Sequence, residues 1–258
     1  MRKLHVISKF FLVVSLFFIS CGSDDEGNVD GGGVTTNPTS YNITSILSKF
    51  DNVDGLNYSV NGDFVEITTN GLPDHKSPYW EQGHALYEAY NGTNPNWNLN
   101  PNTISTQNIV FRIPLKPQEA ANKTATGLGP IGVSVNGVVF YNQYAGPNNQ
   151  PLTNEINSFD QYLGHPQNRG QYHYHIEPTY LTGKFGKSSF LGLLADGFPV
   201  YGPEENGGTV TNADLDVYHG HVSATIDFPD GIYHYHITAE DPYLNGNGYY
   251  GSPGNITQ

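Results

Sequence analysis

The chain has 258 residues, of which 24 are Asp or Glu and 11 are Lys or Arg, so its formal net charge is −13. So acidic a chain lacks the basic surface that a phosphate backbone requires, which excludes a nucleic-acid partner. The 30 glycines and 17 prolines are too many for a helix bundle, and the 13% of aromatic residues are too many for a disordered protein. A single cysteine excludes an internal disulfide and a cysteine-rich zinc site, so a metal must be held by histidine and carboxylate.

The first 20 residues have the layout of a secretory signal peptide. A basic start is followed by an apolar stretch from Phe10 to Ile19, which is too short for a stable membrane span. The lone Cys21 follows directly and resembles the lipidated cysteine of a bacterial lipobox. We therefore expect residues 1–20 to be cleaved and Cys21 to anchor the chain to a membrane through its lipid. An ordinary cleaved signal is the alternative.

Residues 21–40 are predicted to form a flexible tether. The stretch contains an acidic cluster, 24–26, and a glycine run, 31–33, and it has too few apolar residues to bury a core. Acidic residues behind a lipidated cysteine resemble the export signals with which some Gram-negative bacteria send lipoproteins to the outer face of the outer membrane. We expect an outer-membrane lipoprotein exposed at the cell surface, and a merely solvated linker is the alternative.

Residues 41–258 are predicted to form a single antiparallel β-rich domain, a sandwich or barrel-like fold with long Gly-, Pro- and Asn-rich loops and little helix. Asn61-Gly62 and Asn136-Gly137 each lie between apolar-alternating runs, which is a strong hairpin signal. The expected strands are 56–60, 64–68, 109–113, 131–135, 138–141, 172–176, 190–194, 198–201 and 232–238. Helix is expected only at 43–50 and 118–122.

Histidines at alternate positions are the main functional signal. The chain contains three His-x-His pairs: His173 and His175, His219 and His221, and His234 and His236. Random placement of ten histidines gives about 0.4 such pairs, so three are a clear excess. In a strand, side chains at i and i+2 lie on one face roughly 6.6 Å apart, close enough for both imidazoles to bind one metal ion at about 2.1 Å. In the two Tyr-His-Tyr-His segments, the tyrosines then pack on the opposite face.

Other readings of these histidines stay open. Strands whose polar outer faces happen to use His are the alternative for the Tyr-His-Tyr-His segments. The Gly between His219 and His221 weakens the strand prediction there, so the role of His219 is open. His84 stands alone in the sequence, and a lone histidine is more often a hydrogen-bonded residue than a ligand.

The sequence resembles the YHYH family of secreted bacterial proteins, named for this tetrapeptide. The resembling segments are 70–75, 129–138, 159–160, 164–166, 170–175, 195–202, 215–216, 220–221 and 228–236. The resemblance implies an exported, His-rich, metal-binding domain, and no particular reaction. Histidines on family positions, which it implies as metal ligands, are His75, His165, His173, His175, His221, His234 and His236. Family members commonly carry cysteines where this chain has Gln161, Tyr162, Val217 and Tyr218, so a disulfide found in relatives is absent here.

Seven candidate histidines exceed the four ligands of a closed tetrahedral site, so either some support the ligands or there are two metal ions. Nitrogen ligands with carboxylates nearby favour a transition metal, zinc or copper above all, over calcium or magnesium. The predicted function is a cell-envelope lipoprotein that binds such a metal.

Two other functions are compatible with the sequence. One is a zinc- or copper-dependent surface enzyme, hydrolytic or oxidative, that acts on a small-molecule or glycan substrate with Asp160 or Asp196 as general base. No Gly-x-Ser-x-Gly or His-Glu-x-x-His motif supports it, so catalytic residues stay unassigned beyond these two candidates. The other is a carbohydrate-binding module that stacks sugars on tyrosines and on the regions of Trp80 and Trp97.

Overall fold

The computed structural model describes residues 40–258, and the predicted signal peptide, Cys21 and tether lie outside them. The helical elements are short: η1 (Thr44–Phe50), η2 (Glu155–Ser158), α1 (Thr179–Phe185) and η3 (Asn212–Asp214). Between residues 40 and 258, no helix combines the length and the apolar composition that a membrane crossing requires.

Strands dominate the described chain, which confirms the mainly β prediction. They are β1 (Leu56–Asn61), β2 (Phe64–Thr69), β3 (Ile109–Pro114), β4 (Glu119–Thr124), β5 (Gly132–Ser134), β6 (Val139–Phe140), β7 (Tyr144–Ala145), β8 (Gln150–Pro151), β9 (Gly164–Pro166), β10 (Tyr172–Tyr174), β11 (Phe190–Leu194), β12 (Pro199–Tyr201), β13 (Glu204–Glu205), β14 (Gly208–Thr209), β15 (Gly220–Ser223), β16 (Ile232–His236), β17 (Tyr249–Gly251) and β18 (Asn255–Thr257). Among residues 40–258 they form open sheets, and no barrel closes.

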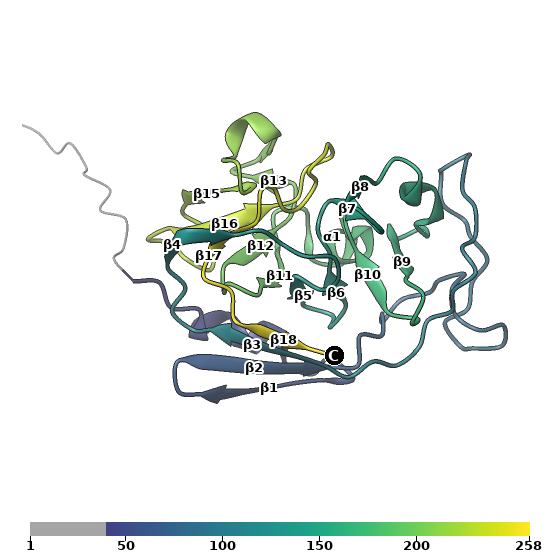
Figure 1. Cartoon of the computed structure of the whole chain (residues 1–258), viewed down its shortest axis with the longest axis horizontal. Helices are drawn as coiled ribbons and strands as arrows, with labels where there is room; N and C mark the ends of the chain where they lie inside the picture. The colour runs from purple at the N-terminus through teal and green to yellow at the C-terminus, as the bar shows by residue number, and fades with distance from the viewer. Residues whose placement is uncertain (1–39) are drawn as a thin grey trace, which may run out of the picture. The chain divides into compact units, whose positions relative to one another are not determined.

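A four-stranded sheet in the order β1-β2-β3-β18 supplies one side of the core. The predicted hairpin at Asn61-Gly62 joins its first two strands. Alternation places Val65 and Ile67 of β2 and Phe111 of β3 on the buried face, where they join one apolar cluster with residues of the larger sheet. In Figure 1 this small sheet lies below the larger one.

An eight-stranded sheet in the order β15-β16-β12-β11-β5-β6-β10-β9 carries most of the histidines. Its two halves have the same topology: a central hairpin, a third strand parallel to the hairpin's outer strand, and an antiparallel edge strand. The halves are β5-β6-β10-β9 and β11-β12-β16-β15. The outer strands, β9 with β10 and β15 with β16, lie at opposite ends of the sheet (Figure 1).

The register shows that the two halves are related by an internal twofold. At the centre, Val133 of β5 pairs with Leu193 of β11, and their neighbours pair symmetrically around them. Within the halves, the pairing of His165 with His173 corresponds to the pairing of His221 with His234. The chain therefore contains a duplicated unit that presents its histidines twice, once at each end of the sheet.

The helical predictions were partly wrong. Residues 43–50 form the short helix η1 as expected, but residues 118–122 belong largely to strand β4, which pairs with β17. That pairing, with Ala120 buried beneath it, outweighs the helix propensity of Glu, Ala and Lys in this segment. Helix α1 was not predicted, although Pro178 directly before it and Gly186 directly after it are typical boundary residues.

Candidate metal sites

Two groups of three histidines and one glutamate converge at the two ends of the eight-stranded sheet. Within each group, one nitrogen or oxygen atom per residue lies within 4.8 Å of the others, and such a group could hold a metal ion. The Glu155 cluster consists of Glu155, His165, His173 and His175. The Glu205 cluster consists of Glu205, His221, His234 and His236.

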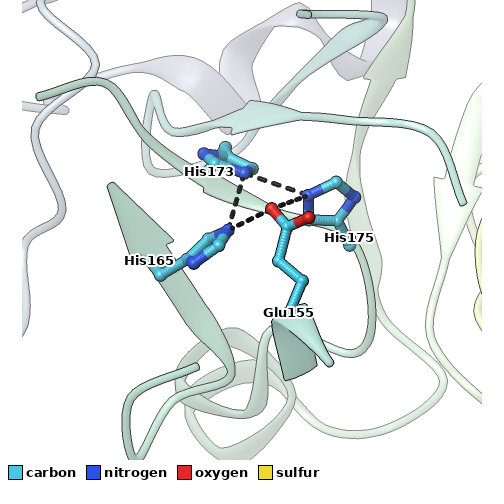
Figure 2. Close-up of side chains that lie close together, drawn as sticks. All are labelled: Glu155, His165, His173 and His175. Atoms are coloured by element: carbon cyan, nitrogen blue, oxygen red, sulfur yellow. Dashed lines mark hydrogen bonds and ion pairs between the residues drawn. The ribbon is translucent and has the colours of Figure 1, made fainter. Parts of the chain in front are cut away.

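In the Glu155 cluster the four side chains point toward one another (Figure 2). Nε2 of His173 lies 3.0 Å from Nε2 of His165 and 3.0 Å from Nε2 of His175. Oε1 of Glu155 is 3.0 Å from Nε2 of His165 and 3.7 Å from Nε2 of His175. Ligands bound at about 2.1 Å in a tetrahedral site are about 3.4 Å apart, so these separations match the span of a single transition-metal ion.

The outer nitrogens of these rings are held by hydrogen bonds. Nδ1 of His173 faces the carbonyl oxygen of Gln171 at 3.1 Å, and Nδ1 of His175 faces that of Asn142 at 2.5 Å. The carbonyl acceptors require a proton on Nδ1 of His173 and of His175, which assigns the tautomers of these two rings. Nδ1 of His165 lies 2.7 Å from Oγ of Ser158, whose own proton is donated to the carbonyl of Glu155, and 3.3 Å from Nδ2 of Asn100, so it contacts a donor as well as an acceptor. The Nε2 lone pairs of His173 and His175 then face the centre of the cluster, the arrangement in which imidazoles ligate a metal.

The Glu205 cluster repeats this arrangement in the second half. Nε2 of His234 and of His236 are 3.0 Å apart, and Oε1 of Glu205 lies 3.2 Å from His234. Nδ1 of His234 donates to the carbonyl of Ile232 and Nδ1 of His236 to that of Gly202, the residue that corresponds to Asn142.

His221 completes the Glu205 cluster and supplies an orphaned atom. Its Nε2 is buried and makes no hydrogen bond within residues 40–258, although Oε2 of Glu205 is 3.3 Å away. A buried polar atom without a partner requires an explanation, and an ion between these side chains would supply one.

Burial keeps the histidines in the form that binds metal. Desolvation lowers the pKa of His165 and of His236, lowers that of His173 well below its usual value, and lowers that of His234 to about 4. Burial alone would raise the pKa of Glu155, but hydrogen bonds and positive charge from His165 and His175 outweigh it and lower the value to about 2. At neutral pH these four histidines are therefore unprotonated and Glu155 is ionised, as metal binding requires.

The two glutamates were missed from sequence. Glu155 begins the short helix η2, whereas Glu205 lies on β13 at the tip of a two-residue-strand hairpin with β14. They occupy unrelated positions in the two halves, so no common spacing from the histidines could have identified them. The duplication itself has a signal in the sequence, because Gly132, Gly137 and Tyr141 of the first half recur at equal spacing as Gly192, Gly197 and Tyr201 of the second half.

Six of the seven histidines implied by the family resemblance lie in the two clusters, and His75 does not. Its Nε2 lies 3.1 Å from the hydroxyl of Tyr174, and its Nδ1 lies 3.0 Å from the carbonyl of Lys76. Tyrosine rings surround it. The structure therefore places His75 in the packing beneath β10, on the face opposite the cluster histidines.

His84 and His219 also lie outside the clusters. His84 is exposed and stacks on Trp80 with ring centroids 4.1 Å apart. His219 is buried at a positive φ of 76°, and its Nε2 lies 3.0 Å from Oγ1 of Thr238. It corresponds to Leu163 of the first half, which has a φ of 65°, so His219 takes the turn position before the edge strand.

Asp160 is buried and accepts hydrogen bonds from Ser77 Oγ at 2.6 Å and from the Tyr172 hydroxyl at 2.9 Å. It is not a member of either cluster. Burial raises its pKa even though these hydrogen bonds favour the ionised form. Asp216 holds the Tyr233 hydroxyl at 3.0 Å in the second half, but its own side chain is exposed.

We expect Asp160→Ala to lower the free energy of unfolding by about 3 kcal/mol, because the change leaves the buried hydroxyls of Ser77 and Tyr172 without an acceptor. The matched Asp216→Ala change removes the corresponding bond at an exposed site and should cost less than about 1 kcal/mol. Urea unfolding of the two variants checks this. Equal losses would show that burial does not set the difference.

Asp196, the other general-base candidate, is fully buried in the second half of the eight-stranded sheet, between β11 and β12 in the chain. Its Oδ2 accepts hydrogen bonds from the Tyr235 hydroxyl at 2.7 Å and from the backbone N–H of Gly251 at 2.8 Å. Desolvation outweighs these bonds and raises its pKa to about 6. The corresponding residue of the first half is Asn136, which contacts the Tyr174 hydroxyl, so an amide fits this position.

We expect Asp196→Asn to remove one component of the pH dependence of stability. A carboxyl whose pKa is raised by folding stabilises the protein fully below its unfolded pKa, and the contribution is lost as the pH rises through about 6. The wild-type advantage over the variant should therefore shrink by about 1 kcal/mol between about pH 5 and pH 7. Urea unfolding of both proteins across this range tests it, and parallel curves would contradict it.

The two clusters differ in what lies over them. All four members of the Glu155 cluster line a pocket of about 660 Å³, together with the loops around Asn100, Tyr144 and Asn168. The pocket beside the Glu205 cluster has about 330 Å³, and of that cluster only Glu205 and His221 line it.

Comparison with known proteins gives one match. A family model described as YHYH protein matches residues 110–211 and 204–248, which together span more than half of the chain and include every residue of both clusters. No curated protein and no solved structure matches the chain.

Proposed function

The chain belongs to the YHYH family, and from that premise we propose that it binds two transition-metal ions, one in each cluster. One observation carries the proposal. In the Glu155 cluster the Nδ1 atoms of His173 and His175 donate to carbonyl oxygens, so the Nε2 lone pairs of these two rings meet 3.0 Å apart, beside Nε2 of His165 and the Glu155 carboxylate, with no proton between them. A divalent cation at the centre would satisfy all four groups at once.

The ligand chemistry favours zinc or copper. Three imidazoles and one carboxylate suit borderline transition metals, whereas calcium and magnesium prefer shells built from oxygen. Ligands on paired strands with hydrogen-bonded outer nitrogens are rigid, which favours tight and stoichiometric binding. The proposed role is to hold these ions in the cell envelope.

Elemental analysis by inductively coupled plasma mass spectrometry tests this function. The full chain, purified without added metal and then after loading with zinc or copper, should carry two equivalents of metal per chain. One equivalent would restrict the function to a single cluster. No uptake of either metal would reject the proposal and leave the histidines as hydrogen-bonding groups.

The cellular location of the protein is a separate part of the proposal. We propose that Cys21 carries the lipid that anchors the protein in the outer membrane, since it directly follows the apolar stretch of the expected signal peptide. Metabolic labelling with a palmitate analogue should mark the wild-type chain and not a Cys21→Ser variant. Labelling of both would place the lipid elsewhere.

A further inference from the structure

We infer that the two proposed metal centres have different tasks: the Glu155 centre takes a fifth ligand from the pocket above it, and the Glu205 centre is structural. The inference rests on the proposed function, because it assigns roles to the metal ions that the clusters would hold. The ligand expected in the pocket is a small uncharged molecule that carries hydroxyl or carbonyl oxygens.

The difference in access is the first step. The pocket over the Glu155 cluster has about 660 Å³, a volume that admits a small molecule, and each of the four proposed ligands forms part of its wall. Glu155 is the most accessible of them, with 25% of its side chain exposed, while His175 has 1%. A molecule in this pocket can therefore contact the side chains that would hold the metal ion.

The Glu205 cluster has a smaller pocket beside it, of about 330 Å³, and only two of its members line that pocket: Glu205 and His221, which are 17% and 23% exposed. His234 and His236 are 0% and 1% exposed and do not line it. The hydroxyl of Ser223 donates a hydrogen bond to Oε1 of Glu205, and Ser223 lies on β15, the edge strand that also carries His221. A metal ion here would tie the β13-β14 hairpin to the outer strands β15 and β16, which is a structural task.

The chemistry of the pocket wall selects the ligand. Among the described residues that line it, none is Lys or Arg, and Glu155 is the only carboxylate. Besides the cluster itself, its polar side chains are carboxamides, tyrosine hydroxyls and the hydroxyl of Ser158, and the side chains of Asn168 and Tyr144 make no hydrogen bond to other parts of residues 40–258. Such a wall can bind hydroxyls and carbonyls, but it offers a phosphate or carboxylate no cation besides the metal.

Azide binding to the copper-loaded full chain tests the difference in access. Azide that coordinates Cu²⁺ produces a charge-transfer absorption band, so it reports an accessible coordination position. His234→Ala, which retains the Glu155 centre, should give the band, and His173→Ala, which retains the Glu205 centre, should not. A band from the Glu205 centre, or none from the Glu155 centre, would overturn the inference.

Metal content measured on the same samples separates the two proposals. If the chain carries no copper, the proposed function fails; if it carries copper but the predicted contrast is missing, only the division of tasks fails. Asn168→Trp should fill the pocket and weaken azide binding at least about tenfold without changing metal content. Arg169→Trp is the matched control, because Arg169 is exposed next to Asn168 but does not line the pocket, and it should leave azide binding unchanged.

Competition against azide tests the ligand class. Xylitol, an uncharged polyol, should displace azide from the Glu155 centre of the His234→Ala variant at lower concentration than inorganic phosphate does. Stronger displacement by phosphate would overturn the assignment of an uncharged ligand.

Discussion

We expect that replacing His173 by Ala removes one of the two proposed metal equivalents and that replacing His234 by Ala removes the other. Each of these histidines lies within 3.0 Å of another ligand nitrogen of its own cluster. Loss of a hydrogen-bond partner behind a ligand already costs 10–100-fold in affinity, so loss of the ligand itself should weaken the affected centre by at least about 100-fold. Combining the two changes should abolish stoichiometric binding, as isothermal titration with zinc would measure.

Two further variants keep this prediction independent of folding. His84→Ala removes an exposed histidine that belongs to neither cluster and should retain both equivalents. Glu155→Gln preserves the shape of the side chain but removes its charge, and should weaken only the first centre. Loss of both equivalents in a single-histidine variant that remains folded would show that the clusters are not independent.

Removing the metal should lower the stability of the protein by several kcal/mol. An ion that binds only the folded chain, present at a thousand times its dissociation constant, stabilises that chain by about 4 kcal/mol per centre. The Glu155 centre joins η2 to β9 and β10, and the Glu205 centre joins β13 to β15 and β16, so chelation frees both ends of the eight-stranded sheet. Urea unfolding of the zinc-loaded chain with and without a chelator measures the difference.

The double variant His173→Ala with His234→Ala is the control for this experiment. Since it lacks both centres, the chelator should not shift its unfolding midpoint. If the wild-type midpoint is equally insensitive while the protein still carries metal, the ions do not contribute to the stability of the fold.

Much of the fold could be predicted from the sequence because its strands carry local signals. The Asn-Gly turns predicted both hairpins that they join, and the segment 190–194 coincides with β11. The twofold pairing of β5 with β11 could not be predicted in this way, since register between distant strands depends on tertiary packing. The helix prediction for residues 118–122 was wrong for the same reason. The pairing of β4 with β17 depends on tertiary structure and is not indicated by the residues of β4 themselves.

The histidines of the candidate site could be predicted from the sequence, because metal-ligating residues recur there at the two-residue spacing of a strand face. The period of two placed His173 and His175 on one face and Tyr172 and Tyr174 on the other, and the structure has them so. The number of centres stayed open because spacing does not show whether the two Tyr-His-Tyr-His strands meet. They lie in opposite halves of the sheet.

The carboxylates were beyond sequence reasoning for a different reason. Glu155 reaches its cluster from the short helix η2 and Glu205 from the short strand β13, at positions that do not correspond in the two halves and that only the tertiary structure brings to the histidines. Two other acidic residues, Asp160 and Asp196, were predicted from sequence as candidate general bases. The structure uses Asp160 and Asp196 to hold tyrosine hydroxyls instead.

The symmetric pairing at Val133 and Leu193 bears on how such a chain arose. A gene for one half, translated alone, would give a protein whose two copies could associate through this same pair of strands, and both centres would then be identical. Fusion of the two copies into one reading frame releases that constraint, because a mutation now alters one centre and spares the other. The unrelated positions of Glu155 and Glu205 are what independent drift after such a fusion would leave.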